Sequence, residues 1–405
     1  MERKLNRKVL LGVSGSIAAF KAAALVRELV KANAEVQVVM TRAAHDFVTP
    51  LTLATLSGRP VLTDMVSGEG TWNDHVHLAR WADVMLIAPL SASTLSKLAH
   101  GQCDNLLIAT YLSMPDPRQG GAPVYMAPAM DLEMYRDAST HANLDLLRAR
   151  GVRQIGPESG DLASGLSGEG RMSEPEAIVA RLHADLVGQS KLNGRTILVS
   201  AGGTQEAIDP VRYIGNRSSG KMGFALAEEA ALRGATVHLV TGPTALHTTV
   251  TGIRRTDVVS AAEMAEACKA LAADCEVVIM SAAVADYRPK RPATEKIKKA
   301  EAQLQVELEP TEDILAYLGA HKPAHQRLVG FALETTDGEA HAQGKLQHKN
   351  LDLIVLNTLQ DPGAGFGHDT NKVTLIGRET KSEPLALMSK VEVARAILDR
   401  IETLL

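Results

Sequence analysis

The chain has 405 residues, enough for two domains of ordinary size that each bury a hydrophobic core. Its 43 basic and 47 acidic residues nearly cancel, which argues against a nucleic acid or an anionic membrane as partner. The three cysteines, Cys103, Cys268 and Cys275, have no metal-like or disulfide-like spacing, so we expect a reducing compartment. No apolar run approaches the roughly 20 residues that a membrane span needs.

The N-terminus carries four basic residues, Arg3, Lys4, Arg7 and Lys8, ahead of an apolar run over residues 9–20. A signal peptide has the same order of charge and apolar residues. Here glycine and serine interrupt the run, which then continues as an amphipathic helix pattern. We therefore expect a soluble, cytoplasmic protein.

The first half of the chain alternates short apolar runs with helix-like patterns, which indicates βαβ units and a parallel sheet. We predict strands at residues 8–14, 35–40, 84–88, 124–127 and 152–155, and helices at about 17–31, 93–99, 132–150 and 174–186. A glycine-rich loop is predicted at 156–171, and residues 188–194 form the predicted linker.

The second half starts the same alternation again. We predict strands at 196–200, 236–240, 277–280, 328–331 and 353–356, a late strand at 371–376 for which antiparallel pairing is an option, and helices at about 221–233, 261–272, 339–348 and 385–404. The chain is therefore predicted to be α/β, with two doubly wound, mainly parallel-sheet domains at 1–190 and 191–405.

The strand ends of the first domain are rich in small hydroxyl side chains and poor in Lys and Arg. Because open parallel sheets bind ligands beyond the carboxyl ends of their strands, such a set could hold one phosphate and a flat ring. The alternative is that these Ser and Thr residues only cap the helices that follow. The residues concerned are Ser14, Gly15, Ser16, Thr41, Ser91, Ser93, Thr94, Met130 and Asp131.

A histidine, His75, lies just before the strand predicted at 84–88. Asn73 or Asp74 could cap a short helix there, on which His75 and Leu78 share a face while His77 points elsewhere. Spacing alone leaves open whether His75 is catalytic or structural.

Four motifs follow one another in the first domain: Gly12-x-x-Gly15-Ser16-Ile17, then His75 before WADVMLIAPLSAST, then Pro128-Ala129-Met130 with Met134, and a loop that ends Gly168-x-Gly170-Arg171-Met172. In this order they resemble the flavin-dependent cysteine decarboxylases over about residues 8–185. The resemblance implies FMN at a trimer interface, oxidation of a cysteinyl thiol by the flavin, loss of CO₂, and His75 as the catalytic base. It implies FMN contacts from Gly15, Ser16, Ile17, Thr41, Ser91, Ser93, Thr94 and Met130, and substrate contacts from Asp131, Met134, Arg171 and Met172.

Two positions depart from the pattern of that family. Asp131 stands where the family usually has Asn, and an ionised Asp repels a substrate carboxylate. Either Asp131 is protonated, or it hydrogen-bonds backbone or flavin, or another residue holds the carboxylate. Ser164 stands where the family has the Cys that helps to reduce the enethiol product, and serine lacks thiol redox chemistry. Cys103, which we expect to be a small buried residue, is a less favoured substitute.

The second domain gathers glycines, hydroxyls and positive charge near its predicted strand ends. These residues are Gly202, Gly203, Thr204, the segment 216–223 with Arg217 and Lys221, the basic run Lys290, Arg291, Lys296, Lys298 and Lys299, and the pair Lys345 and Lys349. Converging cations at a sheet edge suggest a polyphosphate ligand, whereas the alternative is a solvated surface. A GxxxxGK[ST] loop is absent from the sequence.

The segments AGGTQEAIDPVRYIGNRSSGKMG, SAAVADYRP, EKIKK, GFALET and KNLDLIVLN resemble the phosphopantothenate–cysteine ligases over about residues 191–400. The resemblance implies that the 4′-phosphopantothenate carboxylate attacks the α-phosphate of CTP, pyrophosphate leaves, and the cysteine amine attacks the acyl-cytidylate. It implies catalytic roles for Lys296 at the α-phosphate and Asn216 at the acyl group, and Mg²⁺ on the triphosphate. The implied CTP site is Met280, Ser281, Ala282, Asp286, Glu312, Asp313, Ile314, Leu315, Phe331, Lys345 and Lys349.

The order of the two domains resembles the bacterial bifunctional enzymes of coenzyme A biosynthesis, in which the ligase product is the decarboxylase substrate. The resemblance implies small-molecule substrates and self-association through a trimeric flavin domain and a dimeric ligase domain. The alternative is an active ligase with a non-catalytic, flavin-binding or regulatory first domain. The sequence assigns no metal ligands.

Overall fold

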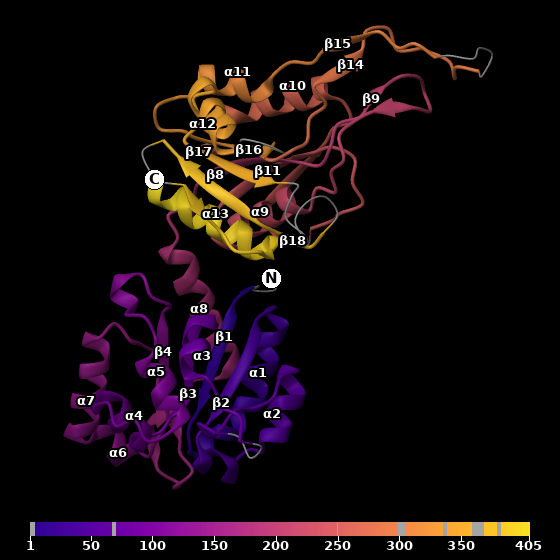
Figure 1. Cartoon of the computed structure of the whole chain (residues 1–405). Coiled ribbons are helices and arrows are strands. Elements are labelled where there is room, and N and C mark those ends of the chain that lie inside the picture. Colours follow the sequence, from indigo (N-terminus) through magenta and orange to yellow (C-terminus); the bar gives the residue numbers. More distant parts are fainter. Residues whose placement is uncertain are drawn as a thin grey trace. The chain divides into compact units, whose positions relative to one another are not determined.

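The computed structural model describes residues 5–66, 70–248, 250–298, 304–334, 338–358, 368–378 and 382–405. The chain divides into two compact units, Met1–Asp185 and Leu186–Leu405 (Figure 1), whereas the sequence placed the boundary after residue 190. Each unit is α/β and is built on its own mainly parallel sheet, which confirms the predicted fold class. No described helix is long and apolar enough to cross a membrane.

Five parallel strands form the sheet of the first unit in the order β2-β1-β3-β4-β5. They are β1 (Lys8–Val13), β2 (Glu35–Met40), β3 (Val84–Leu90), β4 (Val124–Pro128) and β5 (Arg153–Gln154). The strand order reverses between β1 and β3, so the chain leaves these two strands in opposite directions. A crevice opens at their carboxyl ends for that reason, as in other doubly wound sheets.

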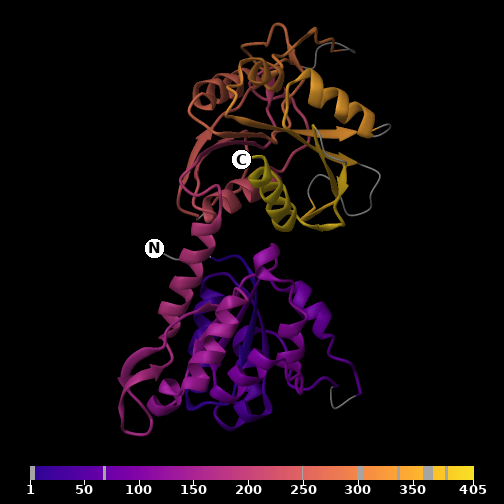
Figure 2. The same ribbon diagram turned by 90° about the vertical axis from the view of Figure 1, so that its left-hand side faces the viewer.

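Helices lie along both faces of this sheet (Figures 1 and 2). They are η1 (Ile17–Lys21), α1 (Ala22–Lys31), η2 (Arg42–Asp46), α2 (Pro50–Ser57), α3 (His75–Trp81), α4 (Ala92–His100), α5 (Leu106–Leu112), η3 (Pro117–Gln119), α6 (Leu132–Arg136), α7 (Ala138–Ala149) and α8 (Pro175–Gln189). The single helix predicted at 132–150 is wrong, because Asp137 leaves the helical conformation and caps a new helix that begins at Ala138, its side chain accepting from Ser139 N. The sequence reasoning missed α2 and α5, and α8 runs into the predicted linker.

The glycine-rich stretch 156–171 is a β-hairpin rather than an irregular loop. Its strands are β6 (Glu158–Asp161) and β7 (Ser167–Arg171), and they pair antiparallel. Gly165 permits the turn because it has a φ of 86°. At Gly170, a Cβ atom would lie 2.3 Å from the carbonyl oxygen of Met130, so only glycine lets the hairpin lie against the loop after β4.

The second unit is built on an eight-stranded sheet in the order β12-β11-β8-β13-β16-β17-β19-β20. The strands are β8 (Thr196–Ala201), β11 (Thr236–Thr241), β12 (Ile253–Asp257), β13 (Val277–Met280), β16 (Arg327–Glu334), β17 (Leu353–Thr358), β19 (Val373–Gly377) and β20 (Glu383–Pro384). The first six in this order pair in parallel, and β19 and β20 pair antiparallel. The antiparallel option for the late strand is thus what the structure contains.

Two hydrophobic cores cover the two faces of this sheet. Ile197 and Val199 lie in one core, with α9 (Lys221–Leu232) and α13 (Lys390–Leu404). Leu198 lies in the other core, with α10 (Ala261–Ala272), α11 (Ile314–His321) and α12 (Gly338–His348). Alternate residues of a strand point to opposite faces, so an apolar run without polar alternation produces a sheet that is covered on both sides.

Short antiparallel pairs extend from the second sheet, and the sequence patterns did not reveal them. They are β9 (Glu206–Ala207) with β10 (Tyr213–Ile214), β14 (Tyr287–Pro289) with β15 (Leu308–Pro310), and β18 (Thr370–Asn371) with β21 (Met388–Ser389). Figure 1 shows the β14–β15 ribbon reaching away from the body of the second unit. Pairs of two or three residues are too short to give a recognisable alternation.

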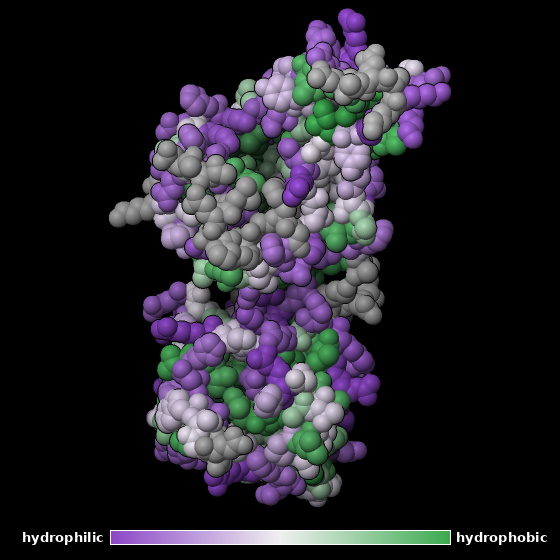
Figure 3. Space-filling model, turned by 45° about the vertical axis from the view of Figure 1, so that its right-hand side comes forward, coloured by the Kyte–Doolittle hydropathy of each residue, from purple (hydrophilic) through white to green (hydrophobic). Residues whose placement is uncertain are grey.

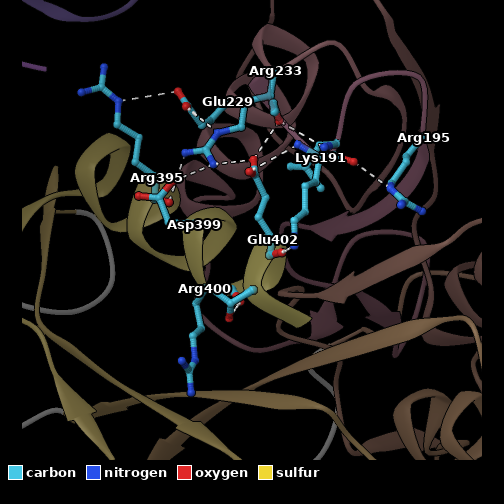
Figure 4. A network of polar contacts seen from close by, with 11 residues as sticks. Lys191, Arg195, Glu229, Arg233, Arg395, Asp399, Arg400 and Glu402 are labelled. Atoms are coloured by element: carbon cyan, nitrogen blue, oxygen red, sulfur yellow. Dashed lines mark hydrogen bonds and ion pairs between the residues drawn. The ribbon is translucent and has the colours of Figure 1, made fainter. Parts of the chain in front are cut away.

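An ion-pair network joins α9 to α13 within the second unit (Figure 4). Arg233 follows α9, and its guanidinium lies 3.0 Å from Glu229, 2.7 Å from Asp399 and 2.9 Å from Glu402. Burial alone would lower the pKa of Arg233, but the charges of Glu229 and Asp399 raise it instead. The Ser190 hydroxyl also donates to Glu402, at 2.7 Å, so the start of this unit is held by the same network.

Candidate functional site

The second unit has a cavity of 790 Å³ at the carboxyl ends of its central strands. Its lining comes from the segments that follow β8, β13, β16 and β17 and from the first residues of α9. Twelve residues that the sequence nominated lie in it: Asn216, Met280, Ser281, Ala282, Asp286, Glu312, Asp313, Ile314, Leu315, Phe331, Lys345 and Lys349. Parallel strands bring these residues together because all of the strands end at the same edge of the sheet.

The two predicted lysines of this cavity are held by carboxylates. Lys345 Nζ lies 2.6 Å from Glu334 Oε1, and Lys349 Nζ lies 2.7 Å from Asp313 Oδ2. Burial by itself would raise the pKa of Asp313, but the hydrogen bond and charge of Lys349, together with the backbone N–H groups of Ala316 and Leu315, outweigh burial and lower the pKa. Both lysines are partly exposed, so these pairs contribute little stability and an anionic ligand can compete for the lysines.

The N-terminus of α9 faces the same cavity. Its N-cap is Gly220, which has a φ of 78° and no side chain to accept the first backbone N–H groups. Gly223 lets α9 lie close to the sheet, since a Cβ atom there would lie 2.5 Å from the Ala201 Cβ. A twelve-residue helix with an uncapped N-terminus next to Ser218 and Ser219 is suited to bind an anion.

Asn216 does not cap a helix. It lies four residues before the N-cap of α9, and its Nδ2 donates to the carbonyl oxygen of Val284 at 2.8 Å. The side chain therefore ties the loop after β8 to the loop after β13. At this position it is exposed and lines the cavity, where a ligand can reach it.

Among the described residues of the second unit to which the resemblance gave a role, Lys296 is the one outside the cavity lining. Other residues of the broader expected phosphate-binding set also lie outside it, which are Gly202, Gly203, Thr204, Lys290, Arg291 and Lys298. Ile297, the neighbour of Lys296, is fixed on both sides: its N–H donates to Asp209 Oδ2 at 3.1 Å, and its carbonyl accepts from Arg212 Nη2 at 2.6 Å. Lys296 itself is exposed beside this contact. Lys299, from the same basic run, lies outside the described residues.

Asp209 organises the loop that holds this segment. Burial alone would raise its pKa, but the backbone N–H groups of Val211, Ile297 and Arg212, together with the Arg212 guanidinium, lower it to about 2. The carboxylate is therefore ionised and fully engaged under ordinary conditions. Asp209 and Arg212 position the chain around Lys296 rather than contact the cavity.

The sequence reasoning did not nominate several further polar residues of this cavity, which are Thr311, Asn357, Asn371 and Lys390. Ser218, Ser219 and Lys221 also line it, and they belong to the segment 216–223 that the sequence had named. Among the described residues, the Oδ1 atoms of Asn357 and Asn371 find no hydrogen-bond partner although they are buried. The sequence could have pointed to the two asparagines, because Asn357 directly follows the strand predicted at 353–356 and Asn371 begins the strand predicted at 371–376. Nothing in the sequence pattern marked Lys390.

The first unit has a smaller cavity, of 480 Å³, at the carboxyl ends of β1, β2 and β3. Gly15, Thr41, Ser91, Ser93 and Thr94 line it, whereas Ser16, Ile17 and Met130, which were also nominated, are not part of the lining. Thr41 Oγ1 is buried here without a hydrogen-bond partner among the described residues. A buried hydroxyl with no partner is costly, so a ligand that bonds to it would stabilise the site.

Two of the nominated serines also cap helices. Ser91 Oγ accepts from Thr94 N and caps α4, and Ser16 Oγ accepts from Ala18 N and caps η1, both at 3.4 Å. Ser14 is fully buried and bridges β1 and β3, because it donates to Pro89 O at 2.7 Å and accepts from Ser91 N at 2.8 Å. Capping and ligand binding are compatible here, since helix N-termini around a cavity also attract anions.

The rim of the first cavity carries two ion pairs that the sequence reasoning missed. Arg42 Nε lies 2.8 Å from Asp64 Oδ1, and Lys97 pairs with Asp104 next to the α5 N-cap, Asn105. The hydrogen bond from Arg42, offset by slight burial, leaves the pKa of Asp64 lowered. The small hydroxyls, the close glycine and these charges fit a phosphate joined to a flat ring.

His75 begins α3, behind the N-cap Asp74, as the sequence predicted. Its ring meets Trp72 edge-on, with 5.8 Å between centroids, and its Nδ1 is buried without a hydrogen-bond partner among the described residues. His77 on the same helix is exposed. His75 is not among the residues that line the 480 Å³ cavity.

The remaining nominated residues of the first unit lie around the hairpin. Asp131 caps α6 and accepts from Leu132 N at 2.7 Å, which is the backbone hydrogen bond that one of the alternatives named. Met134 is exposed, Met172 is buried, and Arg171 lies 2.6 Å from Glu174. Ser164 is exposed in the turn between β6 and β7.

Cys103 is exposed, so the expectation of a small buried residue is wrong. It lies in the irregular segment between α4 and α5, where the chain has left the core. Among the described residues, no group of three or more His, Cys, Asp or Glu side chains gathers as a metal site would.

Comparison with known proteins gives the family. Residues 1–186 match the model of the family described as Flavoprotein, and residues 192–405 match that of the DNA/pantothenate metabolism flavoprotein C-terminal domain. The chain is 44% identical over 405 residues to the coenzyme A biosynthesis bifunctional protein CoaBC of Vibrio cholerae, covering 99% of each chain. The chain belongs to this bifunctional family. The predicted family is confirmed, and with it a coenzyme A biosynthesis enzyme that has a flavoprotein decarboxylase domain and a ligase domain.

Two other relatives complete the comparison. The CoaBC protein of Bacillus subtilis (strain 168) is 44% identical over 402 residues, which is 98% of this chain and 97% of that protein. A protein from an unknown prokaryotic organism, named cysteine/cysteine sulfinic acid decarboxylase, is 48% identical over 362 residues, which is 88% of this chain and 99% of that protein. This bifunctional family member is thus also similar to a protein named only for decarboxylation.

Proposed function

We propose that the chain catalyses two consecutive steps of coenzyme A biosynthesis. The second unit ligates cysteine to 4′-phosphopantothenate with CTP, and the first unit converts 4′-phosphopantothenoylcysteine into 4′-phosphopantetheine. The observation that carries the proposal is the gathering of twelve nominated residues from several strand ends in one cavity of the second unit. The two units have a chemical reason to share one chain, because the product of the proposed ligase is the substrate of the proposed decarboxylase.

In the proposed ligation, Lys345 and Lys349 exchange their carboxylate partners for CTP, while the N-terminus of α9 binds phosphate oxygens. Asn216 holds the activated acyl group, and Mg²⁺ screens the triphosphate. Lys296 stabilises the charge that develops at the α-phosphate. For that role, the segment that carries Lys296 must close over a cavity, in the same chain or in a second copy.

In the proposed decarboxylation, FMN supplies the oxidation of the substrate thiol. FMN would be bound by the cavity residues Thr41, Ser91, Ser93 and Thr94, and the backbone at Gly15 would lie close to it. His75 acts as the base, and its buried, unpaired Nδ1 supports a role that depends on proton exchange.

The substrate side of the first unit would lie at the hairpin. Because Asp131 already accepts a backbone hydrogen bond, we assign the substrate carboxylate to Arg171, which is exposed and can leave Glu174. Ser164 on the hairpin turn has no thiol to take part in the final reduction, so the product can be the saturated aminothiol or the enethiol, which has two fewer hydrogens.

A second candidate for the first unit is decarboxylation of free cysteine or cysteine sulfinic acid. The relative that carries this name is 48% identical to the chain, and a substrate smaller than the phosphorylated amide would need fewer contacts from the hairpin. The alternative of an inert, flavin-binding or regulatory first unit is not favoured, because the chain matches bifunctional relatives over almost its whole length.

One assay separates these candidates. The purified chain receives 4′-phosphopantothenate, cysteine, CTP and Mg²⁺, and CO₂ and thiol products are followed by mass; a parallel reaction contains cysteine alone. Consumption of CTP followed by CO₂ and a saturated aminothiol is the expected result. Ligation without CO₂ would contradict the proposed first-unit activity, and CO₂ from cysteine alone would favour the second candidate.

We also propose that the protein is cytoplasmic and self-associates, with trimeric contacts through the flavin unit and dimeric contacts through the ligase unit. Exposed large hydrophobic side chains on the first unit, among them Ile17, Phe20 and Leu51, support this proposal. Figure 3 shows several groups of hydrophobic residues on the visible face of that unit. Sedimentation of the full chain tests it, and a monomer at assay concentration would contradict it.

A further inference from the structure

A lysine outside the cavity of the second unit holds a carboxylate that lines it. Lys269 Nζ pairs with Glu312 Oε1, and Glu312 is part of the cavity lining whereas Lys269 is not. Lys269 lies in the last turn of α10, and Glu312 lies between β15 and α11. The sequence nominated Glu312 but not Lys269. The pair therefore connects the cavity to a helix that contributes no residue to its lining.

The backbone that carries Glu312 is fixed on both sides. Before it, the N–H of Thr311 donates to the carbonyl oxygen of Asp286 at 2.9 Å. After it, Asp313 caps α11 by accepting from Ala316 N at 2.9 Å. Thr311, Glu312 and Asp313 all line the cavity. The backbone therefore keeps Glu312 at the cavity, and its partner decides the direction of the side chain.

Lys269 occupies a favourable position for a cation. Its Nζ lies 4.1 Å from the centroid of the Tyr317 ring, and that ring stacks on His321 with 4.1 Å between centroids and 22° between planes. The face of an aromatic ring attracts a cation, and so does the partial negative charge at the last turn of a helix. Lys269 is therefore held in place before any ligand arrives, and Glu312 turns toward it.

Glu312 needs this partner because it borders a site proposed for a polyanion. Unlike Asp313, it caps no helix whose backbone N–H groups would stabilise its charge. Without Lys269, the carboxylate of Glu312 would repel a triphosphate. It would also compete for Lys349, which already pairs with the adjacent residue, Asp313, at 2.7 Å.

We expect the effect of this pair in ligand binding rather than in folding. The side chains of Lys269 and Glu312 are 26% and 48% exposed, and a pair of this kind contributes little stability. An unbalanced carboxylate at the cavity acts instead on a ligand that carries several negative charges, so the same charge matters more for affinity. Salt weakens such an effect, because it screens charges that are exposed to solvent.

We propose that Lys269 is a positioning residue of the nucleotide site, which neutralises Glu312 and keeps it from competing for Lys349. This inference rests on the proposed ligation, in which Lys349 leaves Asp313 for CTP. Lys269 itself makes no contact with the ligand. Two adjacent carboxylates can then border a site for a triphosphate, because each of them has a lysine of its own.

Calorimetric titration of the full chain with CTP tests the inference at two salt concentrations, about 0.05 M and about 0.5 M. In Lys269→Met, the dissociation constant for CTP should rise about threefold to tenfold at the lower salt concentration and less at the higher one. The KM for CTP in ligation should rise by a similar factor while kcat stays within about twofold, since Lys269 acts on binding alone. Lys269→Arg, which keeps the charge, should bind CTP like the parent chain.

A second substitution separates positioning from a structural role. Glu312→Gln removes the charge that Lys269 neutralises, so adding it to Lys269→Met should restore the affinity for CTP to within about twofold of the parent value. A loss caused by disturbed packing of α10 on α11 would persist in the double variant and would not depend on salt. Thermal unfolding checks the fold of each variant, and Lys269→Gln replaces Lys269→Met if that variant does not fold.

The matched control is Lys290→Met. It removes the same charge from an exposed pair with Glu307, at 2.6 Å, and neither residue lines the cavity. The control should bind CTP like the parent chain at both salt concentrations.

Unchanged affinity for CTP in Lys269→Met at the lower salt concentration, or a loss that Glu312→Gln does not restore, would overturn the inference. Failure of the parent chain to release pyrophosphate from CTP would instead overturn the proposed ligation. The two failures are distinguishable, because the first concerns binding by variants and the second concerns turnover by the parent chain.

Discussion

The two cavities occupy the same place in two similar sheets but differ in how charge is arranged around them. The second-unit cavity is lined by lysines from both faces of the sheet and by an uncapped helix N-terminus. The first-unit cavity is lined by several hydroxyl side chains, of which Ser91 also caps α4, and its charges are paired at the rim. The fold therefore provides only the location, and the residues after each strand decide whether it suits a polyphosphate or a cofactor with one phosphate.

The two cavities are alike in one respect: each leaves a proposed catalytic residue outside its lining. In the second unit, Lys296 lies apart from the cavity on a segment fixed by Asp209. In the first unit, His75 lies apart from the cavity at the start of α3. Lys296 and His75 therefore each depend on a ligand, a movement or a second copy to complete their sites. If the two sites are independent, variants in one unit should leave the other activity unchanged.

The largest effect is expected at His75. His75→Asn keeps the approximate size of the side chain but removes the imidazole that is proposed to act as the base, so decarboxylation should fall about 10²–10⁴-fold. Ligation should be unchanged, and CO₂ release from supplied phosphopantothenoylcysteine measures the loss. His77→Asn, on the exposed side of the same helix, is the matched control. Normal CO₂ release from His75→Asn would show that this histidine is structural.

The next largest effect is expected at Lys296. Lys296→Gln removes the cation proposed to act at the α-phosphate, so ligation should fall about 10²–10³-fold while decarboxylation of supplied intermediate continues. Release of pyrophosphate from CTP is the measurement. Lys290→Gln is the control, because Lys290 also follows β14, six residues before Lys296, but pairs with Glu307 at 2.6 Å. Loss of both activities in Lys296→Gln would contradict separate sites.

A third test concerns stability rather than chemistry. Arg233→Met leaves Glu229, which is 1% exposed, without its closest cation, and breaking a buried pair typically costs about 3–5 kcal/mol. Hydrogen exchange in the full chain should show this loss in the strands of the second unit and none in those of the first. Arg181→Ala, which breaks an exposed pair on α8, should cost no more than about 0.5 kcal/mol. Equal loss of protection in both units would mean that they unfold together.

The smallest effect is a dependence on pH. The pKa of Asp209 is lowered to about 2, so its hydrogen bonds stabilise the folded state above its unfolded pKa of about 4. That contribution is lost as the pH falls through about 2. The difference in the free energy of unfolding between the parent chain and Asp209→Asn should be constant above about pH 4 and shrink below it. A difference that stays constant down to pH 2 would show that the Asp209 charge is unimportant.

The sequence located the cavity of the second unit well because its residues follow apolar runs that end at one sheet edge. The asparagine at 371 and the lysine at 390 were missed for a different reason. They reach the cavity from a two-residue strand and from the first turn of α13, which the sequence placed at 385. The hairpin at 156–171 was missed because glycine lowers every strand signal, although its backbone freedom is what permits the turn and the close contact with Met130.

The sequence by itself determined that the chain has two α/β units, which family the chain belongs to, and the strands of both sheets except β12 and β20 of the second. These depend on the period of apolar residues and on short motifs, both of which are local properties of the chain. Only the tertiary structure decided that Lys221 and Lys390 share a cavity, that Lys296 lies outside it, and that Cys103 is exposed. Such outcomes depend on how distant segments pack, because a residue's surroundings come mostly from parts of the chain that are far away in sequence.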